Sequence, residues 1–160
     1  MLNKTLSALI FLTAFTAAQP NTPAGYWKSL EMKEKRAFIN GAYSAIGKIK
    51  MHHKQEVKKQ YNQDINWIEP YYIERFYEIL EEHRSKKVGY KVGIIAKTLD
   101  AFYSNYDNEK IPLIEALRIV SLNQDDNRQK ADLYLLKAQR KEIRVKKSVG
   151  RNQRSDGKEK

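Results

Sequence analysis

The spacing of apolar residues is the feature that most narrows the folds open to this chain. Across residues 87–104, apolar side chains recur at alternating steps of four and three, at Val88, Val92, Ile95, Leu99 and Phe102. That spacing places them on one face of an α-helix. No segment shows the two-residue alternation that is typical of a half-buried β-strand. The pattern therefore predicts an all-α protein.

Polar, turn-forming stretches divide the chain into helical segments. We expect five helices, over about residues 30–51, 69–84, 87–104, 112–122 and 126–146. Residues 19–28 are predicted to be extended, because Pro20 and Pro23 disfavour helix around them. The connections are short, so sequential helices should pack antiparallel in a compact bundle.

Two features of the first predicted helix cannot be explained from the sequence: its internal glycines and the point at which it ends. Gly41 and Gly47 lie inside it, and each costs about 1 kcal/mol relative to alanine. Close approach of another helix along Gly41 and Ala45 would account for them. The polar stretch from residue 52 to residue 66 either continues this helix or frays.

The amino terminus has the layout of a secretory signal peptide. A basic start at Lys4 precedes an uncharged run from residue 6 to residue 18, and small residues Thr16 and Ala18 suit cleavage before Gln19. The run is too short to span a bilayer, which takes about 20 apolar residues. We therefore predict a signal peptide over residues 1–18 and an exported product, periplasmic or secreted, without a membrane segment.

The chain has no cysteine, which excludes disulfides, thiolate metal sites and cysteine nucleophiles. A single helical domain over residues 19–146 must then be held by its hydrophobic core. The net charge of +11 belongs mainly to the end of the chain: residues 137–160 carry ten Lys/Arg and three Asp/Glu, giving +7. Residues 147–160 contain almost no apolar side chain and are predicted to form a disordered basic tail.

Two clusters suggest metal ligands, and neither is expected to bind a metal. His52 and Glu56 share a helical face, with His53 beside them, but the surrounding lysines repel cations. Asn105, Asp107 and Glu109 alternate like the start of a calcium loop. However, the loop has lysine in place of its sharp-turn glycine and alanine in place of the glutamate that would close the site. A solvated helix end and a capped turn explain these residues, and no cofactor is expected.

Carboxylates of the second predicted helix offer the main route to an enzyme. Glu78, Glu81 and Glu82 could supply paired carboxylates for glycoside cleavage. We expect them instead to face water, as charge runs on helices usually do. No nucleophile elbow, phosphate-binding glycine loop or zinc-protease motif occurs in the sequence.

The loop between the third and fourth predicted helices is the first candidate for binding, because loops on a rigid scaffold often carry function. Aromatic side chains also gather in the middle of the chain, and adjacent Tyr71 and Tyr72 cannot both be buried easily, so one should join an exposed aromatic patch. The candidate partner-binding residues of the loop are Tyr103, Asn105, Tyr106, Asp107 and Asn108.

Two stretches carry a resemblance to known proteins. One runs from Trp27 through Phe38 to Ala42, and the other from Phe102 to Pro112. Both resemble a group of small, exported, mostly uncharacterised bacterial proteins, and the early Phe-x-x-Gly helix is similar to periplasmic immunity proteins that block secreted cell-wall amidases. The resemblance implies a compact helical exported domain and carries over no catalytic residue.

Together these features favour a non-enzymatic, exported helical domain that binds a partner in the bacterial envelope, and we expect this partner to be a protein. The first alternative is a small envelope hydrolase that uses Glu78 or Glu82. The second is a weak binder of anionic envelope surfaces that acts through its basic tail. Nucleic acid is not an expected partner, because no aromatic residue for base stacking follows Tyr134.

Overall fold

The computed structural model describes the backbone of residues 22–64 and 66–156, and the side chains of these residues up to 144. The predicted signal peptide, residues 1–18, lies outside the described residues, as do residues 157–160. The described part is helical and contains no strand, so the predicted all-α class is confirmed. Its helices are α1 (Pro23–Ser29), α2 (Met32–Gln63), α3 (Tyr71–Glu81), α4 (Val92–Phe102), the short 3₁₀ helix η1 (Tyr106–Asn108), α5 (Leu113–Gln124) and α6 (Arg128–Asp156).

Helix α1 corrects the prediction of an extended segment over residues 19–28, and it raises the count from about five α-helices to six in the described residues. The Thr22 side chain accepts a hydrogen bond from Gly25 N at 3.0 Å and caps the helix. Pro23 occupies the first turn, where its missing N–H costs nothing and its fixed φ favours the helix. The proline thus starts a helix here instead of preventing one.

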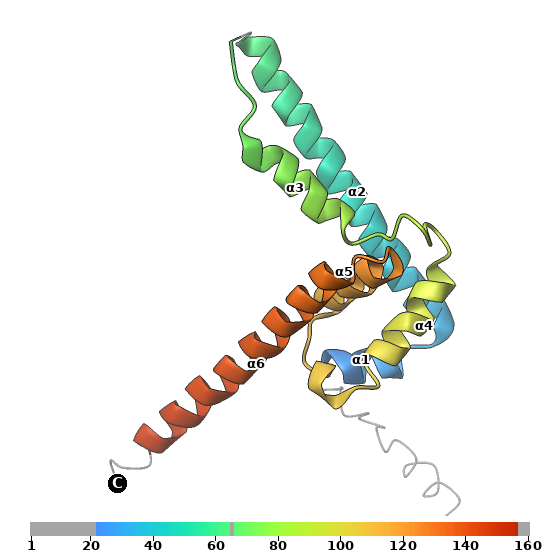
Figure 1. Cartoon of the computed structure of the whole chain (residues 1–160), viewed down its shortest axis with the longest axis vertical. Helices are drawn as coiled ribbons and strands as arrows, with labels where there is room; N and C mark the ends of the chain where they lie inside the picture. Colours follow the sequence, from blue (N-terminus) through green and yellow to red (C-terminus); the bar gives the residue numbers. More distant parts are fainter. Residues whose placement is uncertain (1–21, 65, 157–160) are drawn as a thin grey trace, which may run out of the picture.

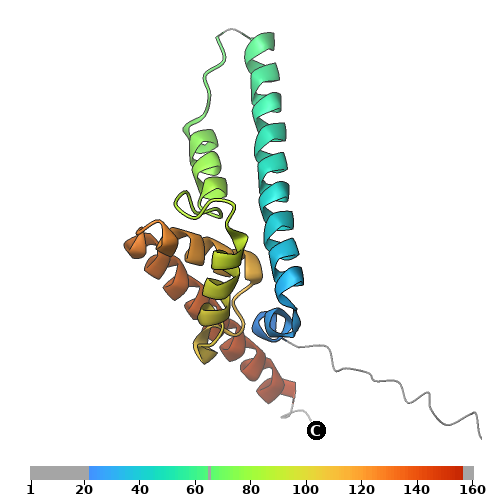
Figure 2. The same ribbon diagram turned by 90° about the vertical axis from the view of Figure 1, so that its right-hand side faces the viewer.

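Helix α2 continues through the polar stretch after residue 51, which settles the alternative that the sequence left open. A capping box starts it, in which Glu31 N donates to the Glu34 carboxylate at 2.8 Å. Its 32 residues span about 48 Å. The second half of α2 and helix α3 lie side by side and project from the rest of the molecule (Figures 1 and 2). We call this pair, with the loop that joins it, the arm.

The hydrophobic core lies below the arm, where α4 packs between the first half of α2 and α5, and α1 packs on α5 (Figure 2). Trp27 of α1 is fully buried there, and its ring meets Phe38 edge to face at 6.0 Å. Ile95 and Leu99, two members of the predicted stripe, are also fully buried. The compact bundle that the sequence predicts therefore exists, but the arm extends beyond it.

Helix α6 packs on α5 and then extends away from the bundle (Figure 1). Two of its side chains that the pattern assigns to the core, Leu136 and Ile143, are about half exposed. Its backbone is helical to Asp156, so the helix predicted over residues 126–146 extends further than expected. Lysine, arginine and glutamine favour helix, and no proline stops it. The described residues contain no helix that combines the length and apolar character of a membrane span.

The packing predicted at Gly41 is wrong, because nothing lies within 4 Å of the position that a Cβ would take. Replacing Gly41 with alanine should therefore raise the free energy of unfolding by about 0.5–1 kcal/mol, since alanine restricts the unfolded chain and meets no neighbour. Urea unfolding followed by circular dichroism measures the change. Gly89→Ala is the contrasting variant, because Gly89 has φ +57° and alanine is strained there. A destabilised Gly41→Ala variant would show that a neighbour does pack at this site.

Candidate functional site

The loop predicted to bind a partner turns two of its five candidate residues inward. Tyr103 is buried, and its hydroxyl donates to the Ile111 carbonyl at 2.7 Å. Burial raises the pKa of Tyr103, so the hydroxyl stays protonated. Asn108 is also buried; its amide donates to the Phe102 carbonyl at 2.9 Å and accepts from Gln139 at 3.0 Å. Both side chains hold the loop closed.

The other three candidates lie on the surface of the loop. Asn105 caps the 3₁₀ helix by accepting from Asp107 N at 2.9 Å. Tyr106 is exposed and is the only large side chain that the five candidates offer to a partner. The loop therefore presents a small surface built around one tyrosine.

The histidine cluster on α2 makes aromatic and polar contacts. The His53 Nδ1 atom lies 3.0 Å from the Tyr77 hydroxyl, and Glu56 pairs with Lys59. Among the described side chains, no group of three or more His, Asp or Glu is placed to hold a metal.

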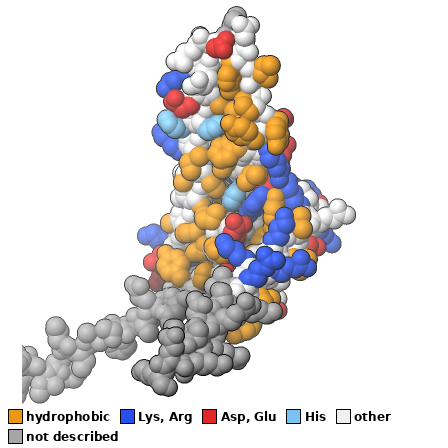
Figure 3. Space-filling view, turned by 90° about the vertical axis from the view of Figure 1, so that its left-hand side faces the viewer, with side chains coloured by type: hydrophobic (Ala, Val, Ile, Leu, Met, Phe, Trp, Pro, Cys, Tyr) orange, Lys and Arg blue, Asp and Glu red, His pale blue; other side chains and the backbone are white. Residues whose placement is uncertain are grey.

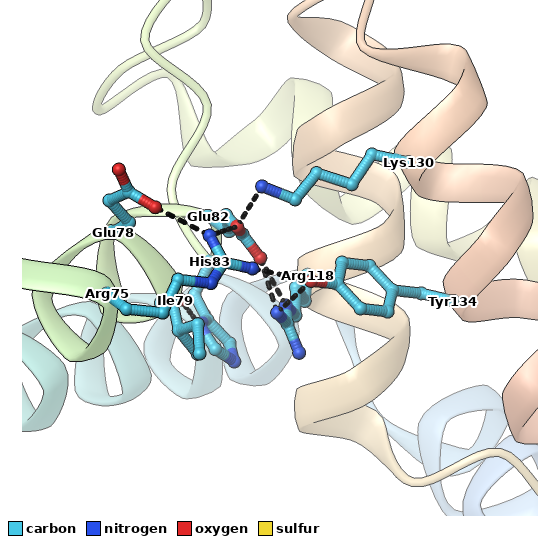
Figure 4. A network of polar contacts seen from close by, with 8 residues as sticks. All are labelled: Arg75, Glu78, Ile79, Glu82, His83, Arg118, Lys130 and Tyr134. Atoms are coloured by element: carbon cyan, nitrogen blue, oxygen red, sulfur yellow. Dashed lines mark hydrogen bonds and ion pairs between the residues drawn. The ribbon is translucent and has the colours of Figure 1, made fainter. Parts of the chain in front are cut away.

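The three candidate carboxylates, Glu78 and Glu81 of α3 and Glu82 at its C-cap, each pair with a cation. Glu78 pairs with Arg75 at 2.6 Å, and Glu81 pairs with Lys50. The prediction that Glu82 faces water is wrong, because its side chain is only 7% exposed. Figure 4 shows it between two other helices, where it pairs with Lys130 of α6 and accepts from Arg118 Nε of α5 at 2.8 Å. We call these residues the Glu82 cluster; it ties the base of the arm to α5 and α6.

The electrostatics of Glu82 suit a structural tie better than catalysis. Burial alone would raise the pKa of its carboxyl, but the bonds from Lys130 and Arg118 outweigh burial and hold that pKa below its usual range. A general acid at neutral pH needs a raised pKa. Arg118 is held in turn by the Tyr134 hydroxyl at 2.6 Å. The arrangement thus does not favour the hydrolase alternative.

The arm instead presents apolar and aromatic side chains to solvent. We call four of them the aromatic patch: Tyr61 (53% exposed), Ile68 (86%), Tyr71 (88%) and Tyr72 (61%). They come from the end of α2, the connecting loop and the start of α3. Figure 3 shows hydrophobic side chains gathered along the arm. The sequence predicts that Tyr71 and Tyr72 are not both buried, and both are exposed.

A row of hollows runs along α2 beside the patch. The first, of about 410 Å³, lies between α2, the end of α3 and the segment over residues 84–90. Two more, of about 390 and 570 Å³, continue toward the free end of the arm. Neighbouring hollows share lining residues, Lys50 between the first two and Lys54 and Lys58 between the second and third. We call this row of three adjoining hollows the lysine groove.

Asp125 fixes the segment that closes the groove. Its carboxylate accepts from the Ser85 hydroxyl at 2.6 Å and from Lys86 N and Lys87 N at 2.9 and 3.1 Å. Burial alone would raise the pKa of Asp125, but these bonds outweigh burial and lower it. The carboxylate thus stays ionised and holds the wall of the first hollow in place.

Sequence reasoning missed the lysine groove for a definite reason. Lys50, Lys54 and Lys58 recur every four residues, which marks one helical face. The sequence shows this spacing, but it did not establish that residues 52–66 are helical, so the lysines could not be placed on one face. The opposite wall comes from residues 30 to 40 positions further along the chain, and no local pattern indicates that contact.

The sequence matches no protein-family model and no curated protein, and no solved structure matches it.

Proposed function

We propose that this chain is an exported, non-enzymatic helical domain that binds a partner protein in the bacterial envelope through its arm. The proposal includes the signal peptide over residues 1–18 and the relation to small exported helical proteins. The aromatic patch is the observation that carries it. Exposed apolar side chains grouped on one projecting element are typical of interaction sites.

The composition of the patch supports a protein partner. Tyrosine combines a large apolar ring with a polar tip, and it is enriched among the residues that dominate protein interfaces. Tyr71 and Tyr72 make no hydrogen bond through their side chains within the described residues, so a partner can contact them without breaking the fold. The neutralised carboxylates of α3 fit a binding role better than a catalytic one.

Replacing Tyr71 and Tyr72 together with serine should reduce capture of the partner by tenfold or more while leaving thermal stability nearly unchanged, because the two rings are exposed. The measurement is recovery of the partner from the envelope fraction with tagged protein, at matched bait concentration.

Tyr106→Ser is the control, since it removes the exposed ring of the other candidate surface. It should leave capture unchanged. If Tyr106→Ser abolishes capture and the Tyr71/Tyr72 variant does not, the binding surface is the loop over residues 103–112 and the assignment to the arm is wrong.

The alternative of an anionic-surface binder depends on residues 147–160. Their side chains lie outside the described residues, so that alternative stays a prediction.

A further inference from the structure

We infer that the lysine groove holds an extended, glutamate- and aspartate-rich segment of the partner protein. The inference rests on the proposed function and adds the chemistry of the segment that is recognised. The first observation is the charge of the residues that line the groove. The groove is lined by five cationic side chains, Lys50, Lys54, Lys58, Arg84 and Lys86, and by two carboxylates, Glu69 and Glu81.

The cations that line the middle of the groove are available to a ligand. Within the described part of the chain, neither Lys54 nor Lys58 forms an ion pair. Lys54 lies over the Tyr77 ring at 5.2 Å, which orients its ammonium group above the floor between α2 and α3. Lys50 is less available to a ligand, because it already forms an ion pair with Glu81.

The spacing of the lysines fits an extended peptide. Residues four apart on α2 advance by about 6 Å along its axis. In an extended chain, side chains on one side are about 6.8 Å apart, because they alternate with those on the other side. Acidic side chains at every second position can therefore face successive lysines without bending the peptide.

The first hollow is built to receive one carboxylate. Arg84 is held in place by two contacts with Tyr90: its Nη1 donates to the Tyr90 hydroxyl at 2.9 Å, and its guanidinium lies 5.2 Å from the ring centroid. A guanidinium so positioned keeps further N–H groups for a bidentate contact with a carboxylate. Asp125 fixes the neighbouring segment, so the hollow needs little rearrangement on binding.

Two of the aromatic rings that line the groove, Tyr77 and Tyr90, are poorly placed to stack the bases of single-stranded nucleic acid. Base stacking needs an open ring face. Tyr77 has Lys50 and Lys54 over its ring at 5.7 and 5.2 Å, and Tyr90 is occupied by Arg84. Tyr43 is buried at the inner wall. Tyr61 also lines the third hollow and is about half exposed, so the choice of an acidic peptide rests on the cations of the groove, and the test below includes an oligonucleotide.

The test uses the purified protein and a fluorescent twelve-residue peptide in which glutamate and serine alternate. Binding is followed by fluorescence anisotropy at low and physiological salt, beside a peptide with glutamine in place of glutamate and a twelve-nucleotide oligothymidine. We expect binding of the glutamate peptide, weaker at higher salt because exposed charges are screened, and none of the glutamine peptide. The Lys54→Ala/Lys58→Ala variant should bind about tenfold more weakly.

The Lys48→Ala/Lys59→Ala variant is the control matched in charge. It removes two exposed lysines from the same helix, and neither lines the groove. It should keep at least half of the affinity. Equal loss in both variants, no binding of the glutamate peptide, or tighter binding of the oligothymidine would overturn the inference. Partner capture that depends on Tyr71 and Tyr72 but not on Lys54 and Lys58 would overturn it while leaving the proposed function intact.

Discussion

Glu82→Ala is expected to lower the free energy of unfolding by about 3–5 kcal/mol, because it leaves a buried cation without a counter-ion. The Arg118 side chain is 12% exposed and the Glu82 side chain 7%. Arg118 is thus the buried cation that loses its counter-ion; Lys130 and Arg75, which also pair with Glu82, are partly exposed, with 30% and 42% of their side chains accessible. Urea unfolding followed by circular dichroism measures the loss.

Two variants separate the buried charge from the rest of the side chain. Glu78→Ala breaks an exposed pair with Arg75 and should cost less than about 1 kcal/mol. The Glu82→Leu/Arg118→Met double variant removes both charges of the central pair and should recover part of the loss. If Glu82→Ala is as mild as Glu78→Ala, the cluster does not tie the arm to α5 and α6.

The same cluster makes stability fall in acid. The pKa of Glu82 is lowered in the fold, so its stabilisation is fully present above the ordinary glutamate pKa of 4.5 and is lost as pH falls through the lowered value. His83 acts earlier. Burial lowers the pKa of its imidazole, so its protonation disfavours the fold once pH falls below the ordinary value of 6.5. Unfolding curves at pH 7.5, 5.5 and 4 should show two stages of loss, and Glu82→Ala should weaken the second.

Trp27→Ala is expected to cost about 3–5 kcal/mol, since it empties the centre of the core. The ring is 0% exposed, and its Nε1 donates to Asp100 at 2.8 Å. Asp100 also accepts from Lys35 Nζ at 2.8 Å, so the tryptophan joins α1, α2 and α4. The free energy of unfolding in urea again measures the effect.

Two further variants provide comparisons for Trp27→Ala: Trp27→Phe and Tyr26→Ala. The phenylalanine keeps most of the apolar contact and loses the hydrogen bond, so it should cost less than alanine. Tyr26 precedes Trp27 on α1 but is 45% exposed, and its replacement should cost about 1 kcal/mol or less. A cost below 1 kcal/mol for Trp27→Ala would show that α1 is not an integral part of the core.

Helical spacing was enough to predict the all-α class and the core stripe on α4, because burial of one face imposes its period on the sequence. Ile95 and Leu99 follow that period and are buried. The same spacing failed at Leu136 of α6, which is half exposed because no described element covers that face. A period indicates a face, but only tertiary packing decides whether that face has a neighbour.

Long-range contacts set the limits on predicting the site. Asn108 sits in a turn-forming stretch, and nothing local distinguishes a solvent-facing amide from one that bonds Phe102 and Gln139. Glu82 follows exposed Glu78 on the same helix, and its burial depends on Arg118 and Lys130, which arrive from other helices. The exposure of Tyr71 or Tyr72 was easier to predict from the sequence, because adjacent large side chains on a helix point in different directions.

The most direct test of the arm as the partner-binding element is photo-crosslinking in living cells. A photoreactive phenylalanine analogue at position 72 should form a discrete adduct with an envelope protein, which mass spectrometry then identifies. The same analogue at position 106 should form no adduct. Adducts from position 106 with none from position 72 would contradict the assignment of partner binding to the arm.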